Sequence, residues 1–174
     1  MIGMQDIQAY LPELEENYQH LHQCPELGFE ETETSAYILK KLAEYGIKGK
    51  QAARTGIIAD IPGSAPGKTV AIRADMDALP IEELSGVSYA SRNEGKMHAC
   101  GHDGHAAILL GIGKSLQEIA GQLNGSVFLC FQIAEEIGKG ADEIVEYLKA
   151  NGGVDEVIST HLMSWLPLGS VTIP

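Results

Sequence analysis

The sequence predicts an α/β domain built on a mixed, largely parallel sheet with helices on both faces. After Lys68, apolar β-rich runs alternate with segments of helical periodicity, which is the pattern of strands joined by crossover helices. A cluster of Pro and Gly between the first two strand-like runs indicates an antiparallel hairpin, so we expect the sheet to be mixed. The 174 residues suffice for one domain with its own hydrophobic core.

Two amphipathic helices are expected before the first strand. The apolar face of the first consists of Ile7, Leu11, Leu14, Tyr18 and Leu21, and the stretch "CPELGFEE" ends it. The apolar face of the second consists of Ile38, Leu39, Leu42 and Tyr45. Thr32 or Thr34 is expected to be its N-cap, and Gly46 is expected to stop it.

The next segment is expected to hold the hairpin. Its strands are "GIIADI" and "KTVAIRAD", which flank "PGSAPG". The polar region from Ile81 to Lys96 reads as a loop. An apolar helix is expected from about Gly104 to Ile119, with Asp103 as its N-cap.

Two further strands and one helix complete the expected sheet. "GSVFLCF" is typical of a buried strand, and "ADEIVEYLKA" of a helix stopped by the Asn-Gly-Gly at 151–153. "VDEVIST" and "LPLGSVTI" are expected to form the last two strands.

The charge balance argues against several classes of partner. Twelve basic and 24 acidic side chains give a formal charge of −12, which opposes binding to nucleic acid and to anionic membranes. No apolar run approaches the ~18–20 residues of a membrane helix, and the N-terminus lacks the features of a signal peptide. We therefore expect a cytoplasmic protein.

The three cysteines do not read as a disulfide framework, because their number is odd and their spacing sparse. Cys130 lies within the apolar run "SVFLCF" and is expected to be a packed core thiol. Cys24 precedes a proline and is assigned no role. Cys100 differs from both, because it lies in "MHACGHDGHAAILLG" among histidines and an aspartate.

Ligand-type residues follow the strands at several points. Asp75 and Asp77 follow "TVAIRA", Glu135 and Glu136 follow "SVFLCFQIA", His161 follows "DEVIST", and Cys100 and His102 lie in the loop before the central helix. Ligands of open α/β sheets bind beyond the carboxyl ends of the strands. Four separate segments are therefore expected to deliver Asp, Cys, His and Glu to one rim.

A divalent metal fits these donors. Thiolate and imidazole suit Zn, Co, Ni or Fe, carboxylates extend the range to Mn, and the mixed set could hold two ions. Of the adjacent Glu135 and Glu136, one would bind metal while the other carries a proton to a leaving nitrogen. Neighbouring residues of a strand point opposite ways, so the backbone must leave strand geometry if both are to reach the centre.

Other interpretations of the same residues stay open at this point. His161 after a strand could be structural, tandem glutamates are commonly a solvated face, and Asp75 and Asp77 could cap a turn. A structural zinc site lacks a second Cys or His pair at finger spacing, and a redox thiol lacks C-x-x-C.

Five ordered motifs carry a resemblance to a known family. They are "HQCPELGFEE", "AIRADMDALPIEE", "MHACGHDGHAAILLG", "FQIAEE" and "THLMSWLPLGSV". Together they resemble the peptidase M20 family, specifically its amidohydrolase branch, over essentially the whole chain. The resemblance implies a zinc-peptidase-like three-layer sandwich and metal-dependent hydrolysis of a small N-acyl amino acid to a carboxylate and a free amino acid. It also implies two divalent ions, drawn from Zn, Mn, Co or Ni.

The resemblance assigns roles residue by residue. It implies that Cys100, His102, Glu136 and His161 are metal ligands. Glu135 matches the general acid/base. Asp77 matches an aspartate that orients a metal-binding histidine in related branches. His98 and His105 lie in the motif and receive no role.

The chain also departs from the family pattern. Ile133 and Ser164 each replace a proline, and both changes are expected to be tolerated. Residues 1–174 would correspond to the N-terminal portion of the catalytic domain, without the lid or dimerisation domain and the C-terminal catalytic segment. An unfinished sheet leaves a strand edge uncovered, so we expect a homo-oligomer. The resemblance implies that the absent segments carry a further histidine ligand and the oxyanion support, so we expect impaired or no turnover. The alternative is a non-catalytic metal-binding or assembly module derived from the family.

Overall fold

The computed structural model describes residues 8–173, so Ile7 of the first expected helix lies outside the described residues. The helices are α2 (Leu11–Gln23), α3 (Thr32–Glu44), α4 (His102–Glu118) and α5 (Ala141–Ala150), with short 3₁₀ turns η1 (Ala120–Gln122) and η2 (Glu135–Ile137). The strands are β1 (Gly49–Ala53), β2 (Gly56–Pro62), β3 (Ala65–Asp75), β4 (Asn124–Gln132) and β5 (Glu156–Ser159). Among the described helices, none combines the length and the apolar composition that crossing a membrane requires.

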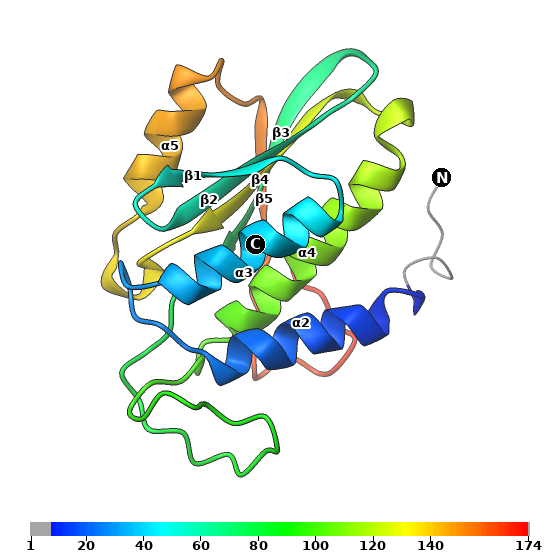
Figure 1. Ribbon diagram of the computed structural model, residues 1–174. Helices are drawn as coiled ribbons and strands as arrows, with labels where there is room; N and C mark the ends of the chain where they lie inside the picture. The colour runs from blue at the N-terminus through cyan, green and yellow to red at the C-terminus, as the bar shows by residue number, and fades with distance from the viewer. Residues whose placement is uncertain (1–7, 174) are drawn as a thin grey trace.

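The five strands form one sheet in the order β1-β2-β4-β3-β5 (Figure 1). β4 pairs antiparallel with β2 and parallel with β3, and β3 pairs parallel with β5. β1 pairs antiparallel with β2, so β2 alone runs against the other four strands. The predicted mixed, largely parallel sheet is confirmed.

The two crossover connections place helices on both faces of the sheet. From β3 the chain passes through α4 to the adjacent β4, and from β4 it passes through α5 back beyond β3 to β5. Crossovers between parallel strands are right-handed, so two crossovers that step in opposite directions must use opposite faces. Figure 1 shows α4 grouped with α2 and α3, while α5 lies apart from them.

Each face of the sheet has its own hydrophobic core. The larger core packs α2, α3 and α4 against the sheet through buried side chains that include Leu21, Ile38, Leu42, Leu109, Leu110, Ile57, Leu129 and Phe131. The smaller core packs α5 on the other face through Ile144, Leu148, Ile58, Phe128 and Cys130. Cys130 is 1% exposed, so its predicted role as a core thiol is confirmed.

The predicted hairpin between residues 56–61 and 68–75 is wrong. β4 lies between these two strands and pairs with both. The "PGSAPG" link passes the start of β4, where the N–H of Gly63 donates to the Gly125 carbonyl at 2.7 Å. A Cβ on Gly63 would lie 2.5 Å from that oxygen, so this link needs glycine there. The hairpin that does form joins β1, which the sequence did not predict, to β2.

The helix ends agree with the predictions in part. Gly46, at φ +75°, ends α3 as predicted: its N–H bonds to the Ala43 carbonyl, and the next N–H bonds to the Leu42 carbonyl. Neither Thr32 nor Thr34 is the N-cap of α3, however. The carboxylate of Glu26 accepts the N–H groups of residues 32, 33 and 34 at 2.8–3.1 Å. A side chain from the preceding loop therefore replaces a local cap.

Asp103 is not the N-cap of α4, because the helix begins at His102 and its N-cap is Gly101, at φ +86°. Asp103 lies within the first turn, where its carboxylate accepts the N–H of Gly104 at 2.8 Å. The earlier start places His102 on the helix rather than in the loop.

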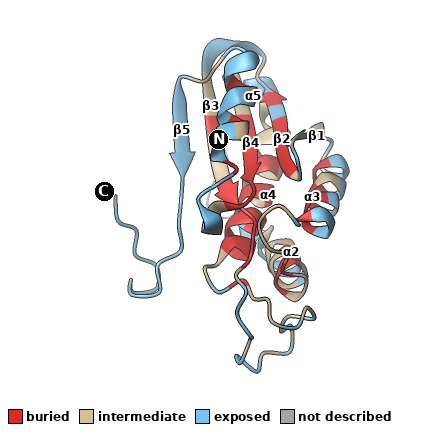
Figure 2. Ribbon diagram, turned by 90° about the vertical axis from the view of Figure 1, so that its left-hand side faces the viewer, coloured by how far each residue is buried: buried red, intermediate tan, exposed pale blue. Residues whose placement is uncertain are grey.

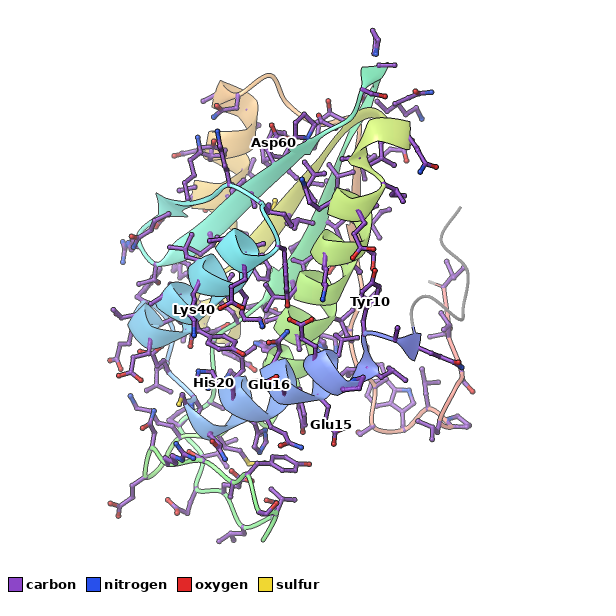
Figure 3. The ribbon with its side chains drawn as sticks, turned by 45° about the vertical axis from the view of Figure 1, so that its right-hand side comes forward. Tyr10, Glu15, Glu16, His20, Lys40 and Asp60 are labelled. Carbon is purple, nitrogen blue, oxygen red and sulfur yellow. The ribbon has the colours of Figure 1, made fainter. Side chains whose placement is uncertain are left out.

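Polar contacts join the three helices of the larger core. The Glu13 carboxylate of α2 accepts Lys41 of α3 at 2.8 Å and Lys114 of α4 at 2.5 Å. Tyr10, immediately before α2, lies beside α4 and donates its hydroxyl to Glu118 (Figure 3). These contacts hold α2 across α4, the helix that carries the ligand-type residues.

The sheet edge formed by β5 is uncovered. All four residues of β5 are exposed, and Figure 2 shows this strand in pale blue beside the buried part of the sheet. The strand predicted over "LPLGSVTI" does not form in the described part of the chain, where these residues take no regular structure. Leu168 and Val171 stay exposed, so the alternation of apolar residues here finds no surface to pack against.

We expect Glu26→Ala to lower the free energy of unfolding by about 1 kcal/mol, as loss of a helix cap does, because three N–H groups of α3 lose their acceptor. Urea denaturation followed by circular dichroism measures this difference. Glu16→Ala, which removes an exposed carboxylate from α2 (labelled in Figure 3), is the control and should change little. Equal effects of the two substitutions would contradict the capping role.

Candidate metal centre

The ligand-type residues gather where β3 and β4 end. These two strands are parallel neighbours, and the chain leaves them toward opposite faces of the sheet through α4 and α5. A crevice at the carboxyl ends of the strands results wherever neighbouring exits diverge in this way. Asp75 ends β3, Asp77 follows it, and Glu135 and Glu136 follow β4.

His102 is the centre of this group. Its ring is fully buried, and Nδ1 lies 2.9 Å from the backbone oxygen of Asp77 and 3.3 Å from Oδ1 of the same residue. Nδ1 therefore carries the proton, which leaves Nε2 as the free acceptor. Nε2 is buried and has no hydrogen-bond partner among the described residues, although it lies 3.6 Å from Glu136 Oε1.

Glu136 Oε1 is likewise buried and without a hydrogen-bond partner in the described part of the chain. Leaving two buried polar atoms unpaired costs free energy, and a cation between them would satisfy both lone pairs. Cys100, His102 and Glu136 each offer an atom within 4.8 Å of the others. The donors present therefore fit a divalent ion, by chemistry and by their unsatisfied atoms.

A second group of possible donors shares His102 with the first. It consists of Asp75, His102, His105 and His161, whose ligand atoms lie within 4.8 Å of one another. His161 also connects the groups, because its Nε2 lies 3.5 Å from the Cys100 sulfur. Of the six sequence-predicted site residues, Cys100, His102, Glu136 and His161 thus come together, with Glu135 and Asp77 beside them.

The backbone after β4 turns out of strand geometry, as both glutamates require. Ala134 adopts φ +53°, and the residues that follow form the 3₁₀ turn η2. The N–H of Glu136 donates to Asp77 Oδ2 at 3.0 Å, which holds this turn against the end of β3. The Glu136 side chain is 17% exposed and the Glu135 side chain 40%, with Glu135 Oε2 at 3.9 Å from His102 Nε2. The more open carboxylate, that of Glu135, is therefore accessible to solvent.

The electrostatics of the group favour a bound cation. Burial, together with the charge of Glu136 and a hydrogen bond to it, raises the pKa of the Cys100 thiol to about 11. Burial opposes protonation of His102, but the hydrogen bond to Asp77 and the charges of Asp75 and Asp77 raise its pKa. A divalent ion would supply the missing positive charge and stabilise the thiolate.

Sequence reasoning missed Asp75 and His105 as a pair. His105 lies three residues after His102 on one helix, a spacing that puts both on the same face. Its Nδ1 lies 2.6 Å from Asp75 Oδ1, and both side chains are buried. Burial alone would raise the pKa of Asp75, but the His105 hydrogen bond and the charges of His102 and Arg73 lower it to about 2. The helical spacing was the available signal.

A cavity of about 610 Å³ opens beside these donors. Its lining includes Tyr18, His98, Cys100, His161, Leu162 and Trp165. His98 is buried, and neither of its ring nitrogens has a hydrogen-bond partner among the described residues. Burial lowers the pKa of His98 to about 4, so this imidazole is neutral near pH 7.

A buried histidine connects the ligand helix to the long loop after β3. His22 Nδ1 lies 2.6 Å from Asp103 of α4, and its Nε2 lies 3.1 Å from Glu83 of the loop. The hydrogen bond to Asp103 raises the pKa of His22; burial opposes the shift and the contact with Glu83 adds to it. The charged imidazolium can donate to both carboxylates at once.

Comparison with known proteins gives consistent results. The family model described as "Peptidase family M20/M25/M40" matches residues 71–173. The chain is 49% identical to N-acetyl-L-cysteine deacetylase of Bacillus subtilis over 153 residues, which cover 87% of this chain and 36% of that protein. It is 43% identical to N-acyl-L-amino acid amidohydrolase of Geobacillus stearothermophilus over 155 residues, which cover 88% and 42%. The chain thus spans about two fifths of the length of these curated relatives.

Solved structures agree with these results. The Bacillus subtilis YXEP protein, described as a dinuclear metal binding peptidase from the M20 family, superposes with a TM-score of 0.88 at 40% identity. The superposition covers 93% of this chain and 46% of that one. A protein from methicillin-resistant Staphylococcus aureus that is described as an aminohydrolase superposes with a TM-score of 0.86 at 41% identity. The superposition covers 91% of this chain and 41% of that one.

The His22 contacts predict a pH-dependent stability. Because the pKa of His22 is raised in the folded state, its contribution is complete below the ordinary value of 6.5 and disappears as pH rises through the higher folded value. Urea unfolding between pH 6 and 9 should show this decline, and His22→Gln should abolish it. The control His20→Gln, in the same helix, should leave the decline unchanged, since the pKa of His20 is lowered. An unchanged pH profile in His22→Gln would contradict the prediction.

Proposed function

Because the chain belongs to peptidase family M20/M25/M40, we propose that it forms part of a metal-dependent amidohydrolase that cleaves N-acyl amino acids to a carboxylate and a free amino acid. The observation that carries the proposal is the pair of buried, unpaired atoms His102 Nε2 and Glu136 Oε1, 3.6 Å apart. Two relatives are named for the hydrolysis of N-acyl amino acids, which supports this substrate class.

Four side chains would hold the metal: Cys100, His102, Glu136 and His161. Thiolate, imidazole and carboxylate together suit Zn, Mn, Co or Ni. A pair of ions is supported by the solved relative that is described as a dinuclear metal binding peptidase. Bound divalent ions would supply Lewis-acid polarisation of the acyl carbonyl.

Glu135 would move the proton. As water adds to the amide carbon, its carboxylate accepts the proton, and it passes that proton to the nitrogen as the C–N bond breaks. Its side chain is 40% exposed, and its Oε2 lies 3.9 Å from His102 Nε2. The substrate would lie in the 610 Å³ cavity that Cys100 and His161 line. Asp77 would orient the site, because it accepts the Glu136 N–H through Oδ2 and holds His102 through its backbone oxygen.

We also propose that these residues form the N-terminal portion of a larger catalytic domain, with a lid and a C-terminal catalytic segment supplied by further chain. The relatives are more than twice as long as the matched region. Val157 and Ile158 point to opposite faces at the β5 edge and are 64% and 50% exposed, so both layers need a further element to cover them.

The metal assignment is tested on the 174-residue chain. Cys100→Ser should weaken Zn²⁺ and Mn²⁺ binding by at least about tenfold, because a ligand is lost, while Glu135→Gln should keep its metal. Elemental analysis and chelator competition measure both. Glu146→Gln, on α5 across the sheet, is the control. Unchanged binding in Cys100→Ser would contradict the assignment.

Turnover is tested after fusion to the C-terminal remainder of the Geobacillus stearothermophilus relative. Amine release from N-acetyl amino acids should appear on fusion, and Glu135→Gln should lower kcat by about 10²–10⁴. A fusion that binds metal but releases no amine would favour the alternative, a non-catalytic metal-binding or assembly module.

Without that remainder, we expect the chain to self-associate through the β5 edge and the exposed apolar residues that follow it, such as Trp165 and Leu168. Sedimentation velocity should show dimers or larger species at micromolar concentrations. Val157→Lys, which places a charge on the edge, should shift the population toward monomer. A monomer at every concentration would rule out self-association.

A further inference from the structure

We propose that His105 is a positioning residue, which fixes the segment after β5 so that His161 reaches the candidate metal centre. The inference rests on the proposed function, since it treats His161 as a ligand. The pairing of β5 with β3 ends at Ser159, two residues before His161, and every residue of β5 is exposed. The position of His161 therefore depends on contacts made beyond the strand.

A series of hydrogen bonds connects β3 to His161, and its first part is centred on the buried carboxylate of Asp75. Arg73 Nη1 lies 2.8 Å from Asp75 Oδ2, and the other oxygen of Asp75 lies 2.6 Å from His105 Nδ1. Asp75 is 1% and His105 3% exposed, so water does not compete for the hydrogen bond between these two side chains. Because the carboxylate only accepts, Nδ1 of His105 must carry the proton, and Nε2 is left as an acceptor.

The second part fixes both the place and the direction of His161. His105 Nε2 accepts the backbone N–H of Leu162 at 2.9 Å. The carbonyl of Leu162 in turn lies 2.7 Å from His161 Nδ1, which can only donate to it. His161 Nε2 is thereby freed as a donor atom for metal, and it lies 3.5 Å from the Cys100 sulfur.

The side chain of Leu162 supports the same arrangement. It packs on two glycines that flank His102: a Cβ added to Gly101 would lie 3.2 Å from Leu162 Cδ1, and one added to Gly104 would lie 3.0 Å from it. Leu162 is therefore held from two sides, by His105 through its N–H and by the ligand loop through its side chain.

His105 is close enough to the donors to be mistaken for a ligand, but both of its ring nitrogens already have partners in the protein. An imidazole with one nitrogen donating and the other accepting has no lone pair left for metal. Its contribution is made through His161. Groups that orient metal-binding histidines typically change metal affinity by about 10–100-fold.

Two substitutions at His105 separate its two hydrogen bonds. In His105→Gln the amide oxygen can occupy the place of Nε2 and accept the Leu162 N–H, while the bond to Asp75 is lost. In His105→Asn the amide nitrogen can occupy the place of Nδ1 and donate to Asp75, while the bond to Leu162 is lost. Zn²⁺ affinity by chelator competition and the thiolate-to-Co²⁺ absorption band of the 174-residue chain are the readouts.

We expect His105→Gln to keep Zn²⁺ affinity within a few-fold of wild type and His105→Asn to lose about 10–100-fold. Unfolding of the metal-free chains controls for a general loss of stability. Equal losses of Zn²⁺ affinity in both variants would indicate that His105 is itself a ligand. A larger loss in His105→Gln would indicate that the bond to Asp75, and not the bond to Leu162, is the one that matters. Either result would overturn the proposal. Absence of Zn²⁺ binding by the wild type would instead refute the proposed function.

A second pair of variants tests the same bond from its other end. Leu162→Pro removes the N–H itself and leaves His105 and Asp75 in place, while Leu162→Ala keeps the N–H and removes the side chain. Leu162 is 51% exposed, so neither change disturbs the core. Proline should lower Zn²⁺ affinity at least about tenfold more than alanine. Equal affinities in the two variants would contradict the proposal.

Discussion

The divergence of the chain at the ends of β3 and β4 is the constraint on which the candidate site depends. These strands are parallel neighbours, so their carboxyl ends meet at one edge, and right-handed crossovers send the following segments to opposite faces. Side chains that follow the strands must therefore face each other across the crevice. The start of α4 closes it from one side, because Gly101 lets the helix begin at His102. The backbone topology alone thus brings together ligand-type residues from segments that are far apart in sequence.

Negative charge predominates in this crevice. Asp75, Asp77, Glu135 and Glu136 all lie within 4 Å of the His102 ring. Arg73 offsets part of the charge at Asp75, and the backbone oxygen of Asp77 fixes which nitrogen of His102 stays free. Of these carboxylates, those of Asp75 and Asp77 are buried, and burying like charges together costs free energy unless a cation or protons compensate it. Burial first, and then this excess of negative charge, raise the pKa of the Cys100 thiol.

Local patterns predicted most elements, and non-local contacts account for the errors. Helical periodicity and apolar runs identified α2–α5 and the strands β2–β5, because those signals lie within a few residues. The pairing of β2 with β4 rather than β3 depends on which strand fills the middle of the sheet, which a Pro/Gly link cannot reveal. The cap of α3 comes from Glu26, outside the helix. The six predicted site residues do come together, but His105 was passed over because its role lies in hydrogen bonds to two distant segments.

The elements that carry the ligand-type residues differ in how well they are buried. Cys100, His102 and Glu136 lie next to β3, β4 and α4, in the best-buried part of the chain, whereas His161 lies after β5, whose residues are all exposed. Local opening of such an edge costs far less free energy than global unfolding. Metal affinity therefore depends on how well β5 is ordered. When an ion binds His161, the free energy of binding is reduced by the entropy cost of ordering β5 and the segment after it. Amide protection in β5 would then report on metal occupancy, and any neighbour that covers this edge would tighten the site without touching a ligand.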